Sequence, residues 1–372
     1  MINKKIKILY TIPNFDTAGS GKALLNLALG LDKEKFETEI LCLHKQGTFF
    51  ETVKNSGIPI HVFDYLPKER PIWKMVLGCW KVSIKLKKIN PDIIHSFHYS
   101  SNYTEALSAK LAGIKWTFTK KNMSWGEASK NSWKLRSFLA DKIIVQNSDM
   151  IKEFYPASKK LSFIPRGVVI EKFKKDIPKS EIRRLMETDE EKRILITVAN
   201  LVPVKNVEIL IHAFKNIHQD FQNWVLWIVG DTNSEYGKKM MDLVAENQLE
   251  SKIKFSGKKL HIVDYLNHAE IFVLPTASKG EGSPVALLEA MANEKVVLGA
   301  EVPGIKDQLF DKEAHLFHPN NVDELANKLQ FFMHNSIEEN NQIGKEFSQF
   351  AAENYSIQIE IEKHEKHYLE LM

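Results

Sequence analysis

The sequence predicts an α/β protein made of two Rossmann-like domains, each built on a parallel sheet. Short apolar runs bounded by glycine, proline or polar residues alternate with longer helical patterns, which is typical of buried parallel strands joined by crossover helices. The order strand, loop of small residues, helix opens at residues 5–28 and starts again at residues 194–214. At 372 residues, the chain is long enough for two domains with separate cores.

The composition is that of a soluble globular protein, with 44% hydrophobic and 26% charged residues. The apolar runs are far shorter than the ~20 residues that a membrane-spanning helix needs. Met1–Lys5 lead directly into a strand, so we expect no secretory signal and a cytoplasmic location. Cys42 and Cys79 are too few for a disulfide framework, and no Cys/His cluster has the spacing of a zinc site.

The net charge of +4 hides an asymmetry between the two halves of the chain. Residues 1–166 contain 27 Lys and Arg against 14 Asp and Glu, a balance of +13, whereas the remainder has a balance of −9. Such a split suggests that the halves face different partners. A basic half suits an anionic surface or an anionic acceptor. Scattered solvated lysines are the alternative interpretation.

The first strand, at residues 5–10, leads through a loop of small residues to an apolar helix that starts near Ala23. The piece Gly19–Ala23 superficially resembles a phosphate-binding P-loop. However, Asp16 stands where that loop needs a glycine, and Ala23 replaces its magnesium-binding hydroxyl group. A dinucleotide-binding loop needs a third glycine where this chain has Leu24. The pattern therefore favours neither a P-loop NTPase nor a dehydrogenase.

Residues 70–88 are expected to form an amphipathic basic helix that carries two tryptophans, Trp73 and Trp80. A helix lying on a membrane surface has this appearance. A helix that covers the sheet, with its tryptophans packed inward, has the same pattern, and we favour this second interpretation.

The rest of the first half continues the alternation of strands and helices. His98 lies in the exit loop of a strand, where ligands collect in doubly wound sheets. The segment from Lys120 through Trp133 and Arg136 is rich in Lys, Arg and Trp, and is expected to be a loop that either holds an anionic acceptor or is mobile. The expected strands are residues 38–43, 60–63, 91–98, 115–119 and 140–148, with a helix at residues 104–113.

The second half begins after a charged, linker-like stretch at residues 172–192. Gly230 and Gly257 each end a strand, so both are expected at the carboxyl edge of the second sheet. A late helix opens at residue 321, and the last helix, from about residue 357 to 371, is amphipathic. The expected strands are residues 194–199, 224–229 and 252–257, and the loop 200–206 leads into a helix at residues 207–214.

One stretch of the second half contains most of the residues that indicate a ligand-binding site. Residues 271–274 are expected to be a buried strand, followed by a loop of small residues and an apolar helix. Ser283 before Pro284 predicts the helix start, because serine can cap and proline tolerates the first helical position. Glu281 and Glu289, eight residues apart, flank the N–H groups of this helix start, which form an anion site. Carboxylates beside a phosphate site suit sugar hydroxyls, so the pattern suggests a sugar nucleotide.

This stretch resembles the E-x7-E signature of the retaining glycosyltransferases of family 4, which have the GT-B fold. Further segments match the family's patterns, namely residues 91–95, 140–148, 163–169 and 302–305. The resemblance covers nearly the whole chain and is strongest in residues 194–330. It implies an N-terminal acceptor-binding domain at residues 1–166, completed by the C-terminal helix 357–372, and a C-terminal nucleotide-sugar domain at residues 167–356.

The resemblance also implies roles for individual residues on the donor side. Lys205 matches the family lysine that holds the donor diphosphate, whereas Asn200 stands where an arginine is usual. Either Arg166 or a lysine supplies the missing charge, or donor binding is weakened. Gly19 and Ser20 match approximately a loop that faces the donor. The expected donor contacts are Gly19, Ser20, Asn200, Gly230, Gly257, Gly282, Ser283, Pro284 and Glu289.

On the acceptor side, many family members carry a histidine just after the strand at residues 115–119. This chain has Lys120 and Lys121 there, and we take His98, Lys120 and Lys121 as acceptor-side candidates. The departure leaves the acceptor's proton without an obvious histidine to receive it. In a retaining mechanism, the leaving phosphate oxygen can take that proton instead.

The resulting hypothesis is a retaining hexosyltransferase that uses a nucleotide sugar. The chain contains no Asp-x-Asp, which favours a metal-independent reaction with Lys205 and Glu281 as catalytic residues. Glu281 would contact the donor hexose, Glu289 the ribose, and Gly282 and Ser283 would offer N–H groups. The expected donor is a UDP-sugar, without any other cofactor. The expected acceptor is a glycan or lipid-linked saccharide of a bacterial cell-surface polysaccharide, with peripheral contact to the anionic inner membrane and no nucleic-acid partner. A non-catalytic sugar-nucleotide-binding relative is the alternative.

Overall fold

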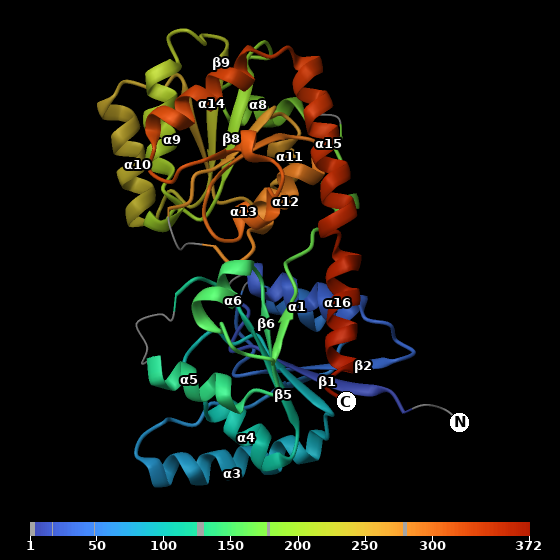
Figure 1. Cartoon of the computed structure of the whole chain (residues 1–372). Coiled ribbons are helices and arrows are strands. Elements are labelled where there is room, and N and C mark those ends of the chain that lie inside the picture. Colours follow the sequence, from blue (N-terminus) through green and yellow to red (C-terminus); the bar gives the residue numbers. More distant parts are fainter. Residues whose placement is uncertain (1–3, 17, 48, 125–129, 177–178, 278–280) are drawn as a thin grey trace. The chain divides into compact units, whose positions relative to one another are not determined.

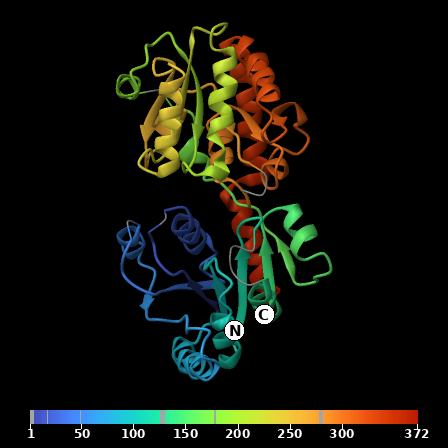
Figure 2. The same ribbon diagram turned by 90° about the vertical axis from the view of Figure 1, so that its left-hand side faces the viewer.

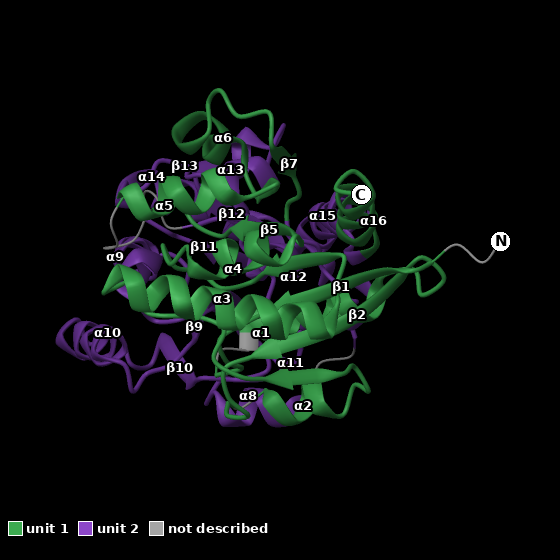
Figure 3. Cartoon of the chain, turned by 90° about the horizontal axis from the view of Figure 1, so that it is seen from below, with its two compact units in different colours: residues 1–165, 358–372 green, residues 166–357 purple. Residues whose placement is uncertain are grey.

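The computed structural model describes residues 4–16, 18–47, 49–124, 130–176, 179–277 and 281–372. The chain divides into unit 1, residues 1–165 and 358–372, and unit 2, residues 166–357 (Figure 3). Each unit has its own parallel sheet with helices packed on it (Figures 1 and 2). This architecture confirms the predicted fold class, α/β with two Rossmann-like domains.

Unit 1 alternates strands and helices from the first strand onward. Its elements are β1 (Ile6–Thr11), α1 (Ala18–Gly30), β2 (Phe36–Cys42), α2 (Phe50–Lys54), β3 (Ile60–Val62), α3 (Ile72–Ile89), β4 (Ile93–Ser96), α4 (Thr104–Ala112), β5 (Lys115–Lys120), α5 (Lys130–Leu139), β6 (Lys142–Val145), α6 (Ser148–Phe154), β7 (Leu161–Phe163) and α16 (Ile357–Leu369). Within the described residues, its strands are ordered β3-β2-β1-β4-β5-β6-β7, and the paired strands are parallel.

Unit 2 repeats the same plan with a second sheet. Its elements are α7 (Ile170–Phe173), α8 (Ser180–Leu185), β8 (Arg193–Val198), η1 (Pro203–Lys205), α9 (Val207–Ile217), β9 (Trp224–Val229), α10 (Glu235–Glu246), β10 (Ile253–Gly257), α11 (Val263–Leu266), β11 (Ile271–Leu274), α12 (Val285–Ala292), β12 (Val296–Ala300), α13 (Ile305–Gln308), η2 (Glu313–His315), β13 (Leu316–Phe317), α14 (Val322–His334) and α15 (Ile337–Tyr355). In the described part of the chain, the strand order is β10-β9-β8-β11-β12-β13.

Local sequence explains most element boundaries. Every residue of β9 and β11 is buried, as expected for parallel strands covered by helices on both faces. Asn147 caps α6, since its side chain accepts a hydrogen bond from the Met150 N–H. Ser336 caps α15 in a capping box with Glu339. These caps satisfy N–H groups that the first helical turn leaves without partners.

The last helix, α16, belongs to unit 1 although it follows unit 2 in sequence (Figure 3). Tyr368 packs there with full burial, and its hydroxyl group is 3.1 Å from that of Tyr10 and 2.7 Å from His95 Nδ1. The histidine of the family-like segment 91–95 therefore holds the terminal helix against β4.

The structure corrects two expectations about helices in unit 1. The segment around Trp133 and Arg136 is not a loop, because both residues lie in α5 and their side chains are buried. The tryptophans of α3 do not pack inward: Trp73 is 62% exposed and Trp80 is 56% exposed.

In unit 2, the stretch at residues 172–192, which was expected to be a linker, contains α8 and the end of α7. Among the described residues, no helix is both long and apolar enough to cross a bilayer.

Candidate functional site

The candidate donor site of unit 2 lies where the strand order of its sheet reverses. The first strand, β8, has β9 on one side and β11 on the other, and ligands in such sheets bind at the carboxyl ends of these central strands. The loop after β8 reaches Lys205, and the loop after β11 reaches Pro284. The two loops are joined, because the Ala277 N–H donates to the Val204 carbonyl oxygen at 2.9 Å.

At this point Lys205 and Glu281, two residues singled out in the sequence, form an ion pair. The Lys205 ammonium group donates to Glu281 Oε1, and the Thr276 hydroxyl group donates to the same oxygen at 2.9 Å. Glu281 is only 7% exposed, so its carboxylate depends on such partners. Thr276 was not predicted as a site residue, because a single threonine after a strand gives no indication of its hydrogen-bond partner.

The start of α12 differs from the predicted cap. The helix begins at Val285, and Pro284 occupies the N-cap position, so Ser283 does not cap it. Instead, the Ser283 hydroxyl oxygen accepts hydrogen bonds from the Arg166 N–H and from Gln308 Nε2, both at 3.0 Å. Proline favours the extended backbone that precedes a helix as well as its first turn. Ser283 thus ties the backbone of Arg166 to the loop that carries Glu281.

Two glycines allow close backbone approaches beside this loop. Gly304 has a φ of +83°, and a Cβ atom there would lie 2.5 Å from the Gly282 carbonyl oxygen. A Cβ atom at Gly230 would lie 2.4 Å from the Ala199 carbonyl oxygen. Side chains at these positions would push apart the loops that hold Lys205 and Glu281.

The remaining donor-side candidates lie on different elements of unit 2. Asn200 is exposed just after β8, and its carbonyl oxygen accepts the Val202 N–H at 2.9 Å. Gly257 ends β10, which lies two places from β8. Glu289 is half-buried, in the second turn of α12.

In unit 1, candidates for both substrates lie at the carboxyl edge of the sheet, with Gly19 and Ser20 expected to face the donor and His98, Lys120 and Lys121 expected on the acceptor side. Gly19 and Ser20 lie in the first turn of α1, one turn earlier than the predicted helix start. The Lys121 ammonium group donates to the Ser20 hydroxyl oxygen at 3.2 Å and to the Phe97 carbonyl oxygen at 2.6 Å. The structure thus brings Ser20 and Lys121 together, although they are far apart in sequence.

His98 is neutral at physiological pH. Burial lowers its pKa to about 3, and the positive charges of Arg136 and Lys121 act in the same direction. Its carbonyl oxygen accepts a hydrogen bond from Arg136 Nη2 at 3.0 Å, which holds the loop in place. An imidazole of such low pKa is a weak proton acceptor.

A buried polar network that the sequence analysis did not foresee holds this loop. Arg136 is fully buried and donates to the Asn102 carbonyl oxygen at 2.5 Å and to the Ser96 hydroxyl oxygen at 3.0 Å. Ser96 in turn donates to Glu105 at 2.7 Å, and the Thr11 hydroxyl group donates to the same carboxylate. Arg136 is therefore a positioning residue rather than part of an acceptor-binding loop.

Lys120 also takes a different place from the one its sequence position suggests. Its side chain is fully buried, and burial lowers its pKa to about 7. The ammonium group donates to the Asn122 carbonyl oxygen at 2.8 Å and lies 4.4 Å from the centre of the Phe154 ring. Lys120 therefore links the segment after β5 to α6. In this conformation its side chain is not accessible to an acceptor.

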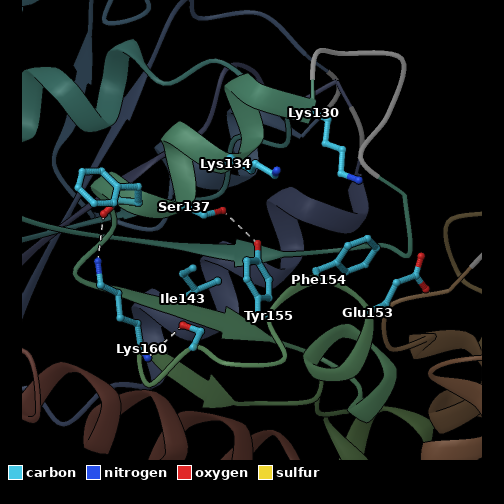
Figure 4. A pocket seen from close by; sticks show the side chains of 10 residues that line it. Lys130, Lys134, Ser137, Ile143, Glu153, Phe154, Tyr155 and Lys160 are labelled. Carbon is cyan, nitrogen blue, oxygen red and sulfur yellow. Dashed lines mark hydrogen bonds between the residues drawn. The ribbon is translucent and has the colours of Figure 1, made fainter.

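A pocket of about 620 Å³ lies in unit 1 between α5 and the connection from α6 to β7 (Figure 4). Lys130 and Lys134 line it from α5, and Glu153 lines it from α6. Its lining residues are Lys130, Lys134, Ser137, Phe138, Ile143, Glu153, Phe154, Tyr155, Ser158 and Lys160. Three lysines against one glutamate give the lining a positive balance, which suits an anionic group. Among the described residues, no group of His, Cys, Asp and Glu is arranged to hold a metal ion.

Comparison with known proteins identifies the family. The model of "Glycosyltransferase Family 4" matches residues 17–172, and that of "Glycosyl transferases group 1" matches residues 178–349. The chain is 28% identical over 280 residues to the UDP-Gal:alpha-D-GlcNAc-diphosphoundecaprenol alpha-1,3-galactosyltransferase of Escherichia coli, covering 69% of each protein. It is 25% identical to the capsular polysaccharide biosynthesis glycosyltransferase CapH of Staphylococcus aureus, covering 80% of this chain and 82% of that protein.

Solved structures show the same fold. A glycosyltransferase from Rickettsia africae superimposes with a TM-score of 0.85 at 18% identity, covering 99% of this chain and 98% of that one. HepE of Anabaena, solved with UDP and glucose, superimposes with a TM-score of 0.81 at 18% identity, covering 98% and 99%. Because family models match both halves of the chain and the structure contains two Rossmann-like units, the protein belongs to glycosyltransferase family 4 and is an enzyme with the GT-B fold.

Proposed function

We propose that the enzyme transfers a hexose or N-acetylhexosamine from a UDP-sugar to a glycan or lipid-linked saccharide during assembly of a bacterial cell-surface polysaccharide. The E. coli relative is named for a UDP-galactose donor and a diphosphoundecaprenol-linked acceptor, and the S. aureus relative is named for capsular polysaccharide. The structure of HepE with UDP and glucose supports the choice of donor nucleotide. The donor serves as co-substrate, and the proposal requires no other cofactor.

The observation that carries this proposal is the Lys205–Glu281 pair at the reversal of the strand order. In glycosyl transfer, the departing diphosphate gathers negative charge while the sugar becomes cation-like. Lys205 can place a positive charge on the diphosphate, and Glu281 can accept hydrogen bonds from hexose hydroxyl groups. The N–H groups at the start of α12 add a second source of positive potential. On this proposal, Arg166 compensates for Asn200 at the position where the family usually has arginine.

We also propose that the reaction retains the anomeric configuration and needs no divalent metal. The neutral His98, with a pKa of about 3, is a weaker base than a phosphate group, whose pKa is about 6. The leaving phosphate oxygen is therefore the better acceptor for the proton of the attacking hydroxyl group. Proton NMR of the product would report the anomeric configuration. Transfer in the presence of EDTA should equal transfer with added magnesium or manganese.

The acceptor side of the proposal rests on charge. The lysine-lined pocket beside α5 and the Lys121 ammonium group both suit an acceptor that carries phosphate. A lipid-linked diphosphate saccharide has that group and lies at a membrane surface. We accordingly propose a cytoplasmic enzyme that makes peripheral contact with the anionic inner membrane.

A binding panel followed by a turnover assay tests the donor assignment. Thermal unfolding is measured with UDP, GDP, ADP and their hexose conjugates for the wild type, Glu289→Ala and, as a matched control, the exposed Glu246→Ala. We expect UDP and one UDP-sugar to raise the Tm of the wild type and the control, and to raise that of Glu289→Ala less. Release of UDP from the stabilising sugar nucleotide is then measured with polysaccharide precursors as acceptors. Stabilisation by GDP or ADP instead would replace the UDP assignment, and binding without any turnover would favour the non-catalytic alternative.

A further inference from the structure

The helix α3 has two apolar stripes, and only one of them packs against the protein. Its buried residues, Met75, Cys79, Val82, Ser83 and Leu86, recur at helical spacing and face α4, where Cys79 Sγ lies 3.6 Å from the Thr104 carbonyl oxygen. The middle of this stripe carries the small side chains of Cys79 and Ser83, which allow close helix packing. It accounts for the burial of α3 without either tryptophan.

The second stripe is exposed and contains the largest side chains of the helix. Trp73 and Trp80 are seven residues apart, two turns along one face, and Val76, Leu77 and Ile84 fall between and beyond them on that face. All five side chains are exposed, as is Ile72 at the start of the helix. A contiguous row of exposed apolar side chains on a soluble protein marks an interaction surface.

Lysines flank this exposed stripe, and acids are missing from the helix. The helical period places Lys74, Lys81, Lys85 and Lys88 along one edge of the stripe, and Lys87 beside its end, with all five exposed. The sequence of residues 72–89 contains no Asp or Glu. Two copies of this chain joined symmetrically across α3 would bring two sets of five ammonium groups together, which is unfavourable. An anionic partner with an apolar interior fits both the charge and the stripe.

We propose that α3 is a membrane-docking helix, which lies in the headgroup region of an anionic bilayer. Trp73, Trp80 and their apolar neighbours insert at the boundary with the acyl chains, and the flanking lysines contact lipid phosphates. The helix lies flat, because its lysines and its buried stripe exclude a spanning orientation. This inference deepens the proposed function, since it rests on an acceptor that is carried by a lipid, and it names the surface by which the enzyme binds the membrane that holds that lipid.

Vesicle co-sedimentation of the full-length protein tests the proposal. Vesicles of phosphatidylcholine alone are compared with vesicles containing about one-third phosphatidylglycerol, at low and high salt. We expect binding to the anionic vesicles at low salt, and loss of most binding at high salt because surface charges are screened. The double variant Trp73→Ser/Trp80→Ser should lower the partition coefficient by about tenfold or more. Lys81→Gln/Lys85→Gln should lower it several-fold and reduce its dependence on salt.

Matched controls use exposed residues of unit 2. Phe331→Ser/Met241→Ser removes exposed apolar side chains, and Lys238→Gln/Lys345→Gln removes exposed charges. Both control variants should bind vesicles as the wild type does. The α3 side chains to be replaced are exposed, so the thermal unfolding of each α3 variant should remain close to that of the wild type.

Three results would overturn the inference. The first is equal binding of the wild type and the tryptophan variant to anionic vesicles. The second is no binding to vesicles at low salt. The third is a dimer in analytical ultracentrifugation that the tryptophan variant abolishes, which would assign the stripe to a second copy. UDP release with a water-soluble acceptor separates this test from the proposed function, because it depends on the donor site and not on α3.

Discussion

At the scale of single residues, the candidate donor site contains an ion pair in which Lys205 and Glu281 neutralise each other's charge. Glu281 is buried and holds the Lys205 ammonium group at the end of η1. On the proposed function, the diphosphate of the donor would bind the Lys205 ammonium group as a second anionic partner. The Glu281 carboxylate would keep its hydrogen bond from Thr276 and could then accept hydrogen bonds from sugar hydroxyl groups.

Replacing Lys205 by alanine should reduce the kcat of sugar transfer by about 10²–10³-fold, because the developing charge on the diphosphate loses its side-chain cation. The same change leaves the Glu281 carboxylate buried with one cation fewer, which should cost about 1–3 kcal/mol of unfolding free energy. Initial rates of UDP release and thermal unfolding measure the two effects.

The control for this substitution is Lys238→Ala, which changes an exposed lysine of α10 in the same unit. Its kcat should equal that of the wild type. If Lys205→Ala also kept wild-type kcat at saturating donor, the assignment of Lys205 to the leaving group would be wrong, and a different cation would have to be sought.

At the scale of elements, α16 joins the sheet of unit 1 through buried histidines. The two ring nitrogens of His367 lie 3.0 Å from Thr117 Oγ1 and 2.8 Å from Ser162 Oγ. Burial lowers the pKa of His367 well below its usual value, and the nearby His364 and Lys142 add to the shift. The folded protein therefore keeps this imidazole neutral.

The sign of the resulting pH dependence follows from proton linkage. The unfolded chain binds a proton at His367 near pH 6.5, whereas the folded chain does so only at much lower pH. The stabilising contribution is therefore complete above pH 6.5 and is lost as the pH falls below it. At pH 5 the loss from this residue amounts to at most about 2 kcal/mol.

Urea unfolding at pH 5 and pH 8 measures this dependence. The variant His367→Gln, whose amide can still bond to Ser162 and Thr117, should show a smaller difference between the two pH values than the wild type. The exposed His261→Gln should keep the wild-type difference. An unchanged difference in His367→Gln would contradict the assignment of a low pKa to His367.

At the scale of the whole molecule, each unit has a core of its own. The core of unit 2 is formed by buried residues between Val168 and Tyr355 and takes none from unit 1. Gly167 marks its beginning, where a Cβ atom would lie 2.7 Å from the Ser356 carbonyl oxygen, and Val168 pairs with Ser356. The two ends of the unit 2 segment thus lie side by side.

The fragment 166–357 is therefore expected to fold by itself with a cooperative thermal transition, and to bind UDP, because the Lys205–Glu281 pair lies within it. Near-UV circular dichroism and isothermal calorimetry measure folding and binding. Unit 1 without residues 358–372 should be less stable than unit 1 with them, because removal of α16 exposes Tyr10 and His95. A fragment 166–357 that unfolds without cooperativity would show that its core depends on unit 1.

How far the sequence predicted this protein depends on how local each feature is. The strands of both sheets and the loops after them follow from runs of apolar residues and their spacing. Lys205 and Glu281 could be selected because each stands in a short family-like pattern at a strand exit. Their ion pair could not be predicted, since it joins residues 76 positions apart through the fold.

The exposed face of α3 was predicted wrongly for a clear physical reason. Both stripes of the helix are apolar at the same period, so periodicity alone cannot decide which one is buried. The tertiary structure decides, because the stripe with Cys79 and Ser83 is the one that packs against α4, whereas both tryptophans lie on the exposed stripe.

The sequence by itself therefore determined the family, the two Rossmann-like units and the residue types at the candidate donor site, because these depend on local order along the chain. Only the tertiary structure decided that Arg136 and Glu105 form a buried network, that Lys120 is enclosed, and that α3 presents its tryptophans to the outside. Those features depend on which side chains of distant segments share a limited space, and close packing leaves one arrangement for them.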